Sequence, residues 1–447
     1  MRNYQQDRPL TKSAIVIGGG LVGSLCVSLL AQRGYKVTLF EKRGDIRKLE
    51  SANGRSINLA LSHRGRQALK LIGIEDEALS HSISMKGRLL HNINGHTKSV
   101  IYDPVSNQCI YSIGRNYLNR ALLDVAEKDP NVRLCFHHKL TDVDFQTGFI
   151  TLKSIKSGEI LQTTADLIIG ADGAFSSLRS FMQKTALFNF SQNFIDHGYL
   201  ELCIPPERGG KLHPNHLHIW PRRELMMIAL PNLDNSWTVT LFMPFKKFES
   251  IRNSENLLHF FNDIFPDALP LIGETELKNF YFSNKPSALV SIKCNRYDMN
   301  GKFLIIGDAA HAMVPFYGQG MNAGFEDCFL LNEILNETRD DVGRTTVLFT
   351  KKRQIEANAI CDLAMYNYEE MRDLVTKPSF VIRKLLDTYL AKIFPRIWIP
   401  LYNSVSFSHM PYSKCIENKH WQNQILYATF SLLILVMATL VVLLRAI

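Results

Sequence analysis

The chain has 447 residues, of which 46% are hydrophobic and 21% charged. This balance is typical of a globular protein with more than one core and excludes a disordered chain. The net charge is +9, but the basic residues are scattered and the longest cluster is 351–353, so we expect a solvated basic surface and no nucleic-acid partner. The eight cysteines form no Cys-x-x-Cys pair and no zinc-type spacing with histidine, so we expect free thiols and no metal.

The first predicted element is a strand, a glycine turn and a helix near the N-terminus. An apolar run ends in Gly18, Gly20 and Gly23, where the first glycine makes the turn, the second leaves room for a pyrophosphate and the third permits close packing. A second predicted strand, 36–41, ends on Glu41, whose carboxylate would accept hydrogen bonds from a ribose diol and repel a 2′-phosphate. The pattern predicts a site for FAD or NAD rather than NADP, and does not choose between the two.

Two later apolar runs also end on a carboxylate. The first ends in Gly-x-Asp-Gly at Asp172, and the second ends at Asp308 and is followed by the glycine-rich stretch 318–324. Asp308 could accept hydrogen bonds from the ribityl chain of a flavin, or it could merely cap a helix. Backbone amides near Met321 and Asn322, at a helix start, would stabilise negative charge on a reduced flavin. The three motifs together favour a flavin over NAD.

The segment between these two motifs and the segment after them differ in predicted structure. Three apolar runs in 217–245 are separated by Pro, Asn and Asp, which predicts a β-sheet with one face free to wall a ligand pocket. Residues 346–420 are mainly helical in propensity and are interrupted by prolines.

The last predicted element is a transmembrane helix. Residues 425–444 are continuously apolar and would extend about 30 Å as a helix, the thickness of a bilayer core. A buried core helix is the alternative. Because basic residues precede the segment and only three residues follow it, we expect a C-terminal tail anchor in a lipid bilayer, with the rest of the chain on the cytosolic side.

The three motifs, in this order, resemble the class A single-component flavoprotein aromatic hydroxylases across residues 13 to about 345. Within that class, the chain is most similar to the members that hydroxylate kynurenine. The stretches that carry this closer resemblance are 55–65, 217–222, 315–327 and 365–372. It implies an α/β fold with a discontinuous, Rossmann-like FAD-binding domain, a β-sheet substrate domain, C-terminal helices and the C-terminal transmembrane helix. The implied extents are 10–75, 105–185 and 290–345 for the FAD-binding domain, 76–104 and 186–289 for the substrate domain, 346–420 for the helical region and 425–444 for the tail anchor.

The resemblance also implies an activity, which is hydroxylation of L-kynurenine to 3-hydroxykynurenine by an enzyme with non-covalent FAD. NADPH and O2 would be co-substrates, the reaction would pass through a flavin C4a-hydroperoxide, and no protein side chain is expected to be catalytic. The chain has no second G-x-G-x-x-G, which fits a class in which NADPH docks transiently. The implied location is the mitochondrial outer membrane.

Substrate and cofactor residues are likewise implied by the resemblance. Arg88 and Tyr102 would hold the substrate carboxylate, and Asn367, Tyr402 and Phe316 would complete the pocket. From the residues alone, Arg88 would be a surface cation and Tyr102 a half-buried strand residue. Phe316 would either exclude water from the flavin or be part of a packed turn. The expected cofactor contacts are Gly18, Gly20, Gly23, Glu41, Ala60, Arg115, Leu140, Asp172, Asp308, Met321 and Asn322.

Three alternative functions remain at this point. A hydroxylase of another aromatic acid or of a lipophilic quinone precursor would share every flavin motif. An FAD-free NAD dehydrogenase would share only the first motif. A membrane-tethered flavin-binding scaffold without turnover would share all three.

Overall fold

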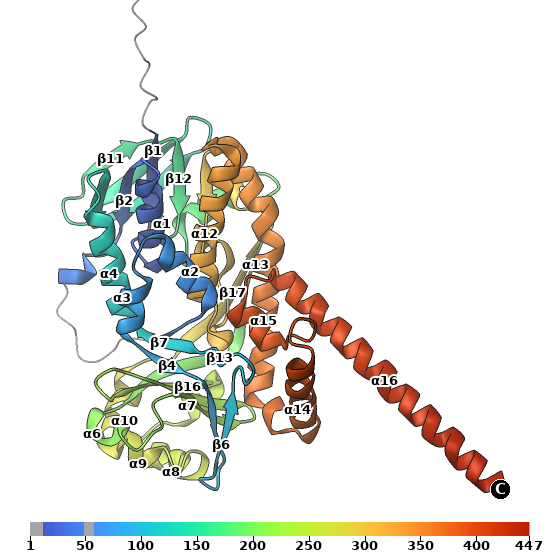
Figure 1. Cartoon of the computed structure of the whole chain (residues 1–447). Coiled ribbons are helices and arrows are strands. Elements are labelled where there is room, and N and C mark those ends of the chain that lie inside the picture. The colour runs from blue at the N-terminus through green and yellow to red at the C-terminus, as the bar shows by residue number, and fades with distance from the viewer. Residues whose placement is uncertain (1–11, 49–57, 447) are drawn as a thin grey trace, which may run out of the picture.

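The computed structural model describes residues 12–48 and 58–446 (Figure 1). Residues 55–57, at the start of one stretch of resemblance, and residues 10 and 11 lie outside the described residues. The fold is α/β, with two large sheets stacked along the long axis of the body and helices around them.

The first large sheet brings the three glycine and carboxylate motifs together. Its order is β18-β19-β12-β1-β2-β8, and every pair except β18–β19 is parallel. Ile17 lies beside Gly170, which in turn lies beside Ile305, so the three motifs leave the sheet at the same edge. Ligands of open parallel sheets bind beyond such an edge. The strands are β1 (Ser13–Ile17), β2 (Lys36–Glu41), β8 (Val132–Phe136), β12 (Leu167–Gly170), β18 (Asp298–Met299) and β19 (Phe303–Ile305).

Two glycines determine how the first helix meets this sheet. Gly18 has φ +106°, a conformation that residues with a side chain rarely adopt. A Cβ at Gly23 would lie 1.9 Å from the carbonyl oxygen of Gly18, so the helix can pack this closely only with glycine there. The helices against this sheet include α1 (Leu21–Gln32), α4 (Arg115–Glu127), α5 (Ser177–Met182), α11 (Asp308–His311) and α12 (Gly320–Thr338).

The second large sheet has the order β17-β13-β16-β15-β14-β5-β6. Its side chains alternate between the two faces. Met227, Val239 and Leu241 point into a core shared with the helices below the sheet, whereas Met226 and Thr240 line a cavity on the other face. The β-sheet predicted in 217–245 is therefore confirmed. The strands are β5 (Gly87–His91), β6 (Thr97–Ile101), β13 (Phe190–Ile204), β14 (His216–Arg222), β15 (Leu225–Pro231), β16 (Trp237–Pro244) and β17 (Ser287–Cys294), and the helices below are α6 (Pro206–Gly209), α7 (Phe245–Ser250), α8 (Ser254–Ile264), α9 (Leu269–Ile272) and α10 (Glu274–Ser283).

Two small sheets and two short helices complete the body. One sheet has the order β3-β7-β4 and the other β11-β10-β9. Their strands are β3 (Asn58–Leu61), β4 (Ser82–Met85), β7 (Ile110–Gly114), β9 (His138–Asp144), β10 (Phe149–Ser154) and β11 (Ile160–Thr163), and the helices are α2 (His63–Leu71) and α3 (Glu75–Ser80).

The C-terminal region is helical, as predicted. It comprises α13 (Val342–Arg372), α14 (Pro378–Ile393), α15 (Leu401–Phe407) and α16 (Tyr412–Ala446). Pro378 is at the start of α14, where a missing N–H costs nothing.

The last helix leaves the body and extends alone (Figure 1). Tyr412 and Gln422 are fully buried, whereas nearly every residue from Ile425 onward is exposed. The segment Tyr412–Arg445 is long and apolar enough to cross a membrane, with a mean hydropathy of 2.5 in its most apolar part, none of which is buried. The alternative of a buried core helix is therefore wrong, and the exposed apolar length fits a membrane span.

Candidate active site

A cavity of about 720 Å³ lies between the two large sheets. Gly18 and Glu41 border one end of it, and Arg88 and Tyr402 the other. The expected site residues that line it are Gly18, Gly20, Glu41, Ala60, Arg88, Arg115, Leu140, Asp172, Asp308, Phe316, Met321 and Tyr402. Gly23, Tyr102, Asn322 and Asn367 do not line it and act from behind.

At the nucleotide end, Glu41 is held by the turn it faces. Its carboxylate accepts hydrogen bonds from the backbone N–H of Gly19 at 2.7 Å and of Arg43 at 2.8 Å. Burial acts to raise the pKa of Glu41, but these bonds and the Arg43 guanidinium hold it below its usual value. Gly20 is the N-cap residue of α1, no side chain caps this helix, and a Cβ at Gly20 would meet nothing within 4 Å. Open space at an uncapped helix start fits a pyrophosphate.

Asp308, which also lines the cavity, is the first residue of α11. Gly307 occupies the N-cap position and no side chain caps this helix, so the alternative that Asp308 is only a cap is wrong. The Asp308 side chain faces the cavity, and no hydrogen bond to it is seen among the described residues. Its enclosure within the protein raises the pKa of this carboxyl.

The start of α12 lines the cavity with its backbone, and one of its side chains supports the neighbouring cavity wall. Gly320 and Met321 line the cavity, and α12 also begins without a side-chain cap. Asn322 is fully buried and instead donates to the carbonyl oxygens of Ala60 and Gly318, both at 2.8 Å. Its side chain therefore fixes the strand that carries Ala60, and only its backbone belongs to the helix start.

These groups fit FAD. The Glu41 carboxylate and the uncapped start of α1 match a ribose and the pyrophosphate. The Asp308 carboxylate and the uncapped start of α12 match a ribityl chain and the flavin ring. One carboxylate oxygen of Asp172 is also buried without a hydrogen-bond partner, although the other accepts from the N–H of Ser177 at 2.6 Å.

At the other end, Arg88 is buried in an aromatic pocket. The residue is only 4% exposed, and its guanidinium lies 4.7 Å from the ring centre of Tyr402, which stacks on Tyr102 at 4.8 Å. Nη1 of Arg88 lies 3.2 Å from the carboxylate of Glu370, while Nε has no hydrogen-bond partner in the described structure. The expectations from the residues alone are wrong for both, because Arg88 is no surface cation and Tyr102, just beyond β6, is 7% exposed.

Helix α13 supplies the polar residues behind this pocket. Asn367 is 1% exposed and donates to the carbonyl oxygen of Phe316 at 2.7 Å, which fixes the turn that carries Phe316. The Phe316 ring stacks on Tyr368 at 4.0 Å and also lines the cavity, so it belongs to both a packed turn and the pocket. Glu370 was not predicted. It lies within 365–372, one of the stretches of resemblance, but no spacing in the sequence links it to Arg88.

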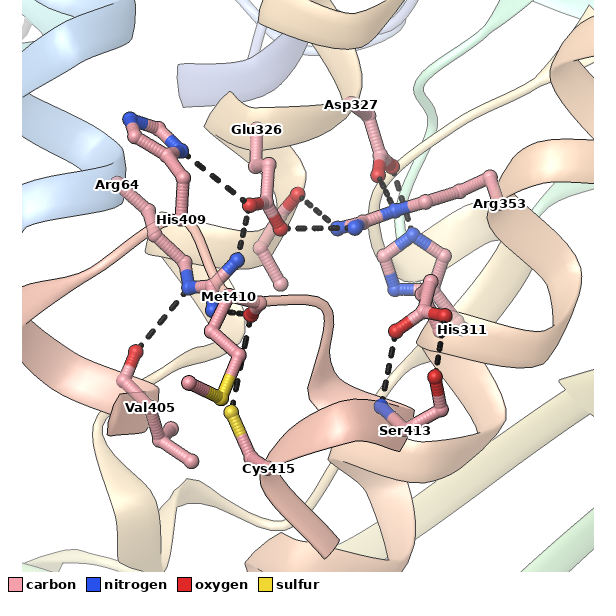
Figure 2. A network of polar contacts seen from close by, with 12 residues as sticks. Arg64, His311, Glu326, Asp327, Arg353, Val405, His409, Met410, Ser413 and Cys415 are labelled. Atoms are coloured by element: carbon pink, nitrogen blue, oxygen red, sulfur yellow. Dashed lines mark hydrogen bonds and ion pairs between the residues drawn. The ribbon is translucent and has the colours of Figure 1, made fainter. Parts of the chain in front are cut away.

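A buried charge network lies behind the start of α12 (Figure 2). Asp327 accepts from the N–H of Gly307 at 2.7 Å and from Nε of Arg353 at 2.6 Å, and it pairs with His311 at 2.6 Å. Glu326 pairs with Arg353 at 2.7 Å and with Arg64. Burial opposes charge on both carboxylates, but their cationic partners hold the pKa of Glu326 and that of Asp327 below their usual values.

The same network reaches the C-terminal segment. Arg64 donates to the carbonyl oxygen of Val405 at 3.1 Å, and its guanidinium lies 3.9 Å from the ring centre of Tyr412. The backbone N–H of Ser413 donates to Glu356 at 2.9 Å. The turn before Asp308 is thus joined through buried ion pairs to the first turn of α16.

Comparison with known proteins agrees with this geometry. Residues 11–359 match the model of a family described as FAD binding domain. The chain is 54% identical to a kynurenine 3-monooxygenase of Anopheles gambiae, over 95% of this chain and 87% of that protein. It is 45% identical to a kynurenine 3-monooxygenase of Sus scrofa, over 93% and 88%.

A solved structure, a tetrameric form of 2-methyl-3-hydroxypyridine-5-carboxylic acid oxygenase, superposes with a TM-score of 0.68 at 21% identity, over 87% of this chain and 99% of that one. That likeness shows the fold alone. The family match and the relatives show that the chain belongs to the kynurenine 3-monooxygenase family of FAD-binding flavoproteins.

Proposed function

We propose that this chain is an FAD-dependent monooxygenase that hydroxylates L-kynurenine to 3-hydroxykynurenine, with NADPH as reductant and O2 as the oxygen source. The observation that carries the substrate assignment is Arg88, a buried cation with an unpaired Nε beside an aromatic cavity. L-Kynurenine combines an arylamine ring with a zwitterionic amino-acid tail, which matches an apolar pocket with charged groups at one end. Bound FAD supplies the redox chemistry, which is reduction by NADPH and activation of O2.

The charged end of the pocket orients the substrate. The substrate carboxylate pairs with the Arg88 guanidinium. The Tyr102 hydroxyl, buried beside the cavity without a hydrogen-bond partner among the described residues, is the second donor proposed for it. The α-ammonium group pairs with Glu370, whose carboxylate lies beside Arg88. Tyr402 and Asn367 hold these groups in place through the ring contact with Arg88 and the bond to the Phe316 turn. The arylamine ring is thereby directed into the cavity, which Asp308 also lines.

The chain holds the cofactor at both ends. Gly18, Gly20 and Glu41 receive the adenosine diphosphate half, and Asp308 and the α12 backbone receive the flavin half. Apolar and aromatic side chains would exclude water between the two ends and so disfavour loss of the activated oxygen as hydrogen peroxide. The other residues proposed to contact FAD are Ala60, Arg115, Leu140, Asp172 and Met321, whereas Gly23 and Asn322 are proposed to support the cofactor site from behind.

The tail places the enzyme on a membrane. We assign it to the mitochondrial outer membrane with the catalytic body in the cytosol, a proposal supported by the exposed apolar length of α16 and by the basic residues that precede it. Protease treatment of intact mitochondria tests this orientation. The body is expected to be digested while the inner compartments stay protected.

The activity is tested with the purified full-length protein in detergent. NADPH oxidation is measured with and without L-kynurenine, and 3-hydroxykynurenine is quantified by chromatography in the same sample. Kynurenine-dependent oxidation coupled to hydroxylated product is the expected result. Oxidation that yields hydrogen peroxide without product would show that kynurenine is only an effector, and a panel of other aromatic acids and quinone precursors would then identify the substrate.

A further inference from the structure

Helix α14 is amphipathic, but its apolar face points away from the protein, unlike that of a helix on the surface of a soluble protein. Polar residues in the middle of the helix face the protein, since Asp387 is 8% exposed and accepts hydrogen bonds from Arg383 at 3.0 Å and from Trp398 at 2.9 Å. Its large apolar residues face outward at helical spacing. They are Ile382, Leu385, Leu386, Tyr389 and Ile393, between 43% and 66% exposed. A soluble surface helix shows the reverse arrangement.

The apolar surface continues past the end of the helix. Phe394 and Ile397 are 48% and 61% exposed, and Trp421, near the end of the packed part of α16, is 40% exposed. We call α14 together with these three residues the α14 apolar face. Contiguous exposed apolar surface of this kind marks a site of interaction with a protein or a membrane.

The position of this face relative to the membrane span is fixed by side-chain contacts. Arg383 donates to Asn423 at 2.6 Å, and Asp387 lies 3.7 Å from Lys419. Asn423 precedes the first exposed residue of the span, Ile425, by less than one helical turn. Figure 1 shows α14 at the side of the body from which α16 departs. The α14 apolar face therefore lies at the level where α16 enters the membrane.

The charge around this face favours an anionic lipid surface. Between residues 377 and 424 the chain has seven lysines and arginines against two carboxylates. Basic residues close to a span are attracted to anionic headgroups. Apolar side chains flanked by basic ones are the composition of helices that lie in the plane of a membrane interface.

We propose that the α14 apolar face is a second membrane contact, which inserts among the headgroups and upper acyl chains of an anionic bilayer while α16 spans it. This inference rests on the proposed tail anchor. The two contacts together hold the body against the bilayer in one orientation, whereas a single span would leave it free to tilt. Met371, which lines the cavity, is near the end of α13, the helix that precedes α14, so the substrate end of the cavity lies on the side of the body that carries this face.

The test uses full-length protein in vesicles whose phosphatidylcholine carries brominated acyl chains, which quench nearby tryptophans. The variant L385W places a tryptophan on the α14 apolar face. The matched control is I160W, because Ile160 in β11 is equally exposed, at 69% against 66% for Leu385. The emission of the parent chain, which has four tryptophans, is subtracted.

The tryptophan of L385W is expected to lose roughly half of its added emission, and more in vesicles that contain an anionic phospholipid, whereas that of I160W loses none. Unquenched emission from L385W in a chain that floats with the vesicles would overturn the proposal and leave the tail anchor intact. Blue-shifted, unquenched emission that depends on protein concentration would also overturn it and would assign the face to a second copy of the chain. If the full-length protein did not float with the vesicles, both the anchor and the second contact would be overturned.

Discussion

The guanidinium of Arg88 and the carboxylate of Glu370 lie 3.2 Å apart, with side chains only 5% and 15% exposed. Buried ion pairs are stabilising only when their remaining polar atoms are also satisfied. Here Nε of Arg88 is left without a partner. Arg88 lines the cavity and Glu370 lies directly beside it, so a cation and an anion are adjacent at this end, a charge pattern complementary to a free α-amino acid group.

The variant E370Q distinguishes recognition of the substrate's ammonium group from recognition of its carboxylate. We expect the KM for L-kynurenine to rise about tenfold, equivalent to about 1.4 kcal/mol, because the ammonium group loses its charged acceptor. The analogue 4-(2-aminophenyl)-4-oxobutanoate lacks that ammonium group, so its KM is expected to stay unchanged or fall. The measurement is KM for both compounds at constant FAD content. An equal rise for both would mean that Glu370 acts only by positioning Arg88.

Replacing Arg88 removes the partner of the substrate carboxylate. The variant R88M keeps much of the side-chain length and is expected to lower kcat/KM by about 2–5 kcal/mol, because a buried carboxylate is left unpaired. FAD content should not change. The matched control is R372M, whose guanidinium lies over the Tyr368 ring at 4.7 Å but does not line the cavity. A KM for R88M equal to that of the parent would remove Arg88 from the substrate site.

Replacing Asp308 tests the flavin end. In the variant D308A the ribityl hydroxyls lose a charged acceptor, which corresponds to about 1.5–3 kcal/mol, or roughly a ten- to hundredfold weaker FAD affinity. Titration of the apoprotein with FAD, followed by flavin fluorescence, gives the Kd. The control E337A removes an exposed carboxylate that pairs only with Lys352 among the described contacts. An unchanged Kd for D308A would show that its carboxylate does not contact the cofactor.

The cofactor half of the site could be predicted because its signals are local. A turn at Gly18, a carboxylate at the end of the next strand and a Gly-Asp at Asp308 each occupy a few consecutive residues. Parallel pairing of β1, β12 and β19 then brings their ends together. The fold class followed from the same motifs.

The substrate half could not be derived from local pattern, because its residues come from distant parts of the chain. Asn367 lies 279 positions after Arg88, and Glu370 lies 282 positions after it. Arg88 stands between Gly87 and Leu89 on β5, a context that equally fits an exposed cation. The orientation of its side chain depends on the helices that cover it, and no propensity or spacing encodes that contact.

A buried chain of hydrogen-bonded histidines could also not be predicted from the sequence. Nε2 of His218 lies 3.0 Å from the carbonyl oxygen of His213, so it donates, and Nδ1 of His218 lies 2.9 Å from Nε2 of His91. Nδ1 of His91 lies 2.8 Å from Asp267. Burial lowers the pKa of His218 from its ordinary 6.5 to about 3. The folded protein therefore holds His218 neutral.

This histidine makes stability depend on pH. The unfolded chain binds a proton near pH 6.5, whereas the folded chain does so only near pH 3, so the unfolded state binds more protons between these values. The contribution to stability is complete above pH 6.5 and is lost as the pH falls toward 3, by about 2 kcal/mol at pH 5. We expect the melting temperature of the variant H218Q to vary less than that of the parent between pH 7.5 and pH 5. Parallel profiles for the two proteins would contradict this account.

The tail is expected to have two separable parts. Ending the chain after Gln424 removes only the exposed part of α16, so kcat/KM in detergent should stay within about 0.5 kcal/mol of the parent value. Ending it after Ser408 also removes two contacts of the Arg64 guanidinium, which are the Tyr412 ring and the carbonyl oxygen of Met410. Breaking up a buried ion network typically costs about 3 kcal/mol or more, so the shorter chain should lose FAD and activity together. Both chains are assayed for flavin content and kynurenine-dependent NADPH oxidation. Equal flavin content and activity in the two truncations would show that the packed turns of α16 do not support the flavin site.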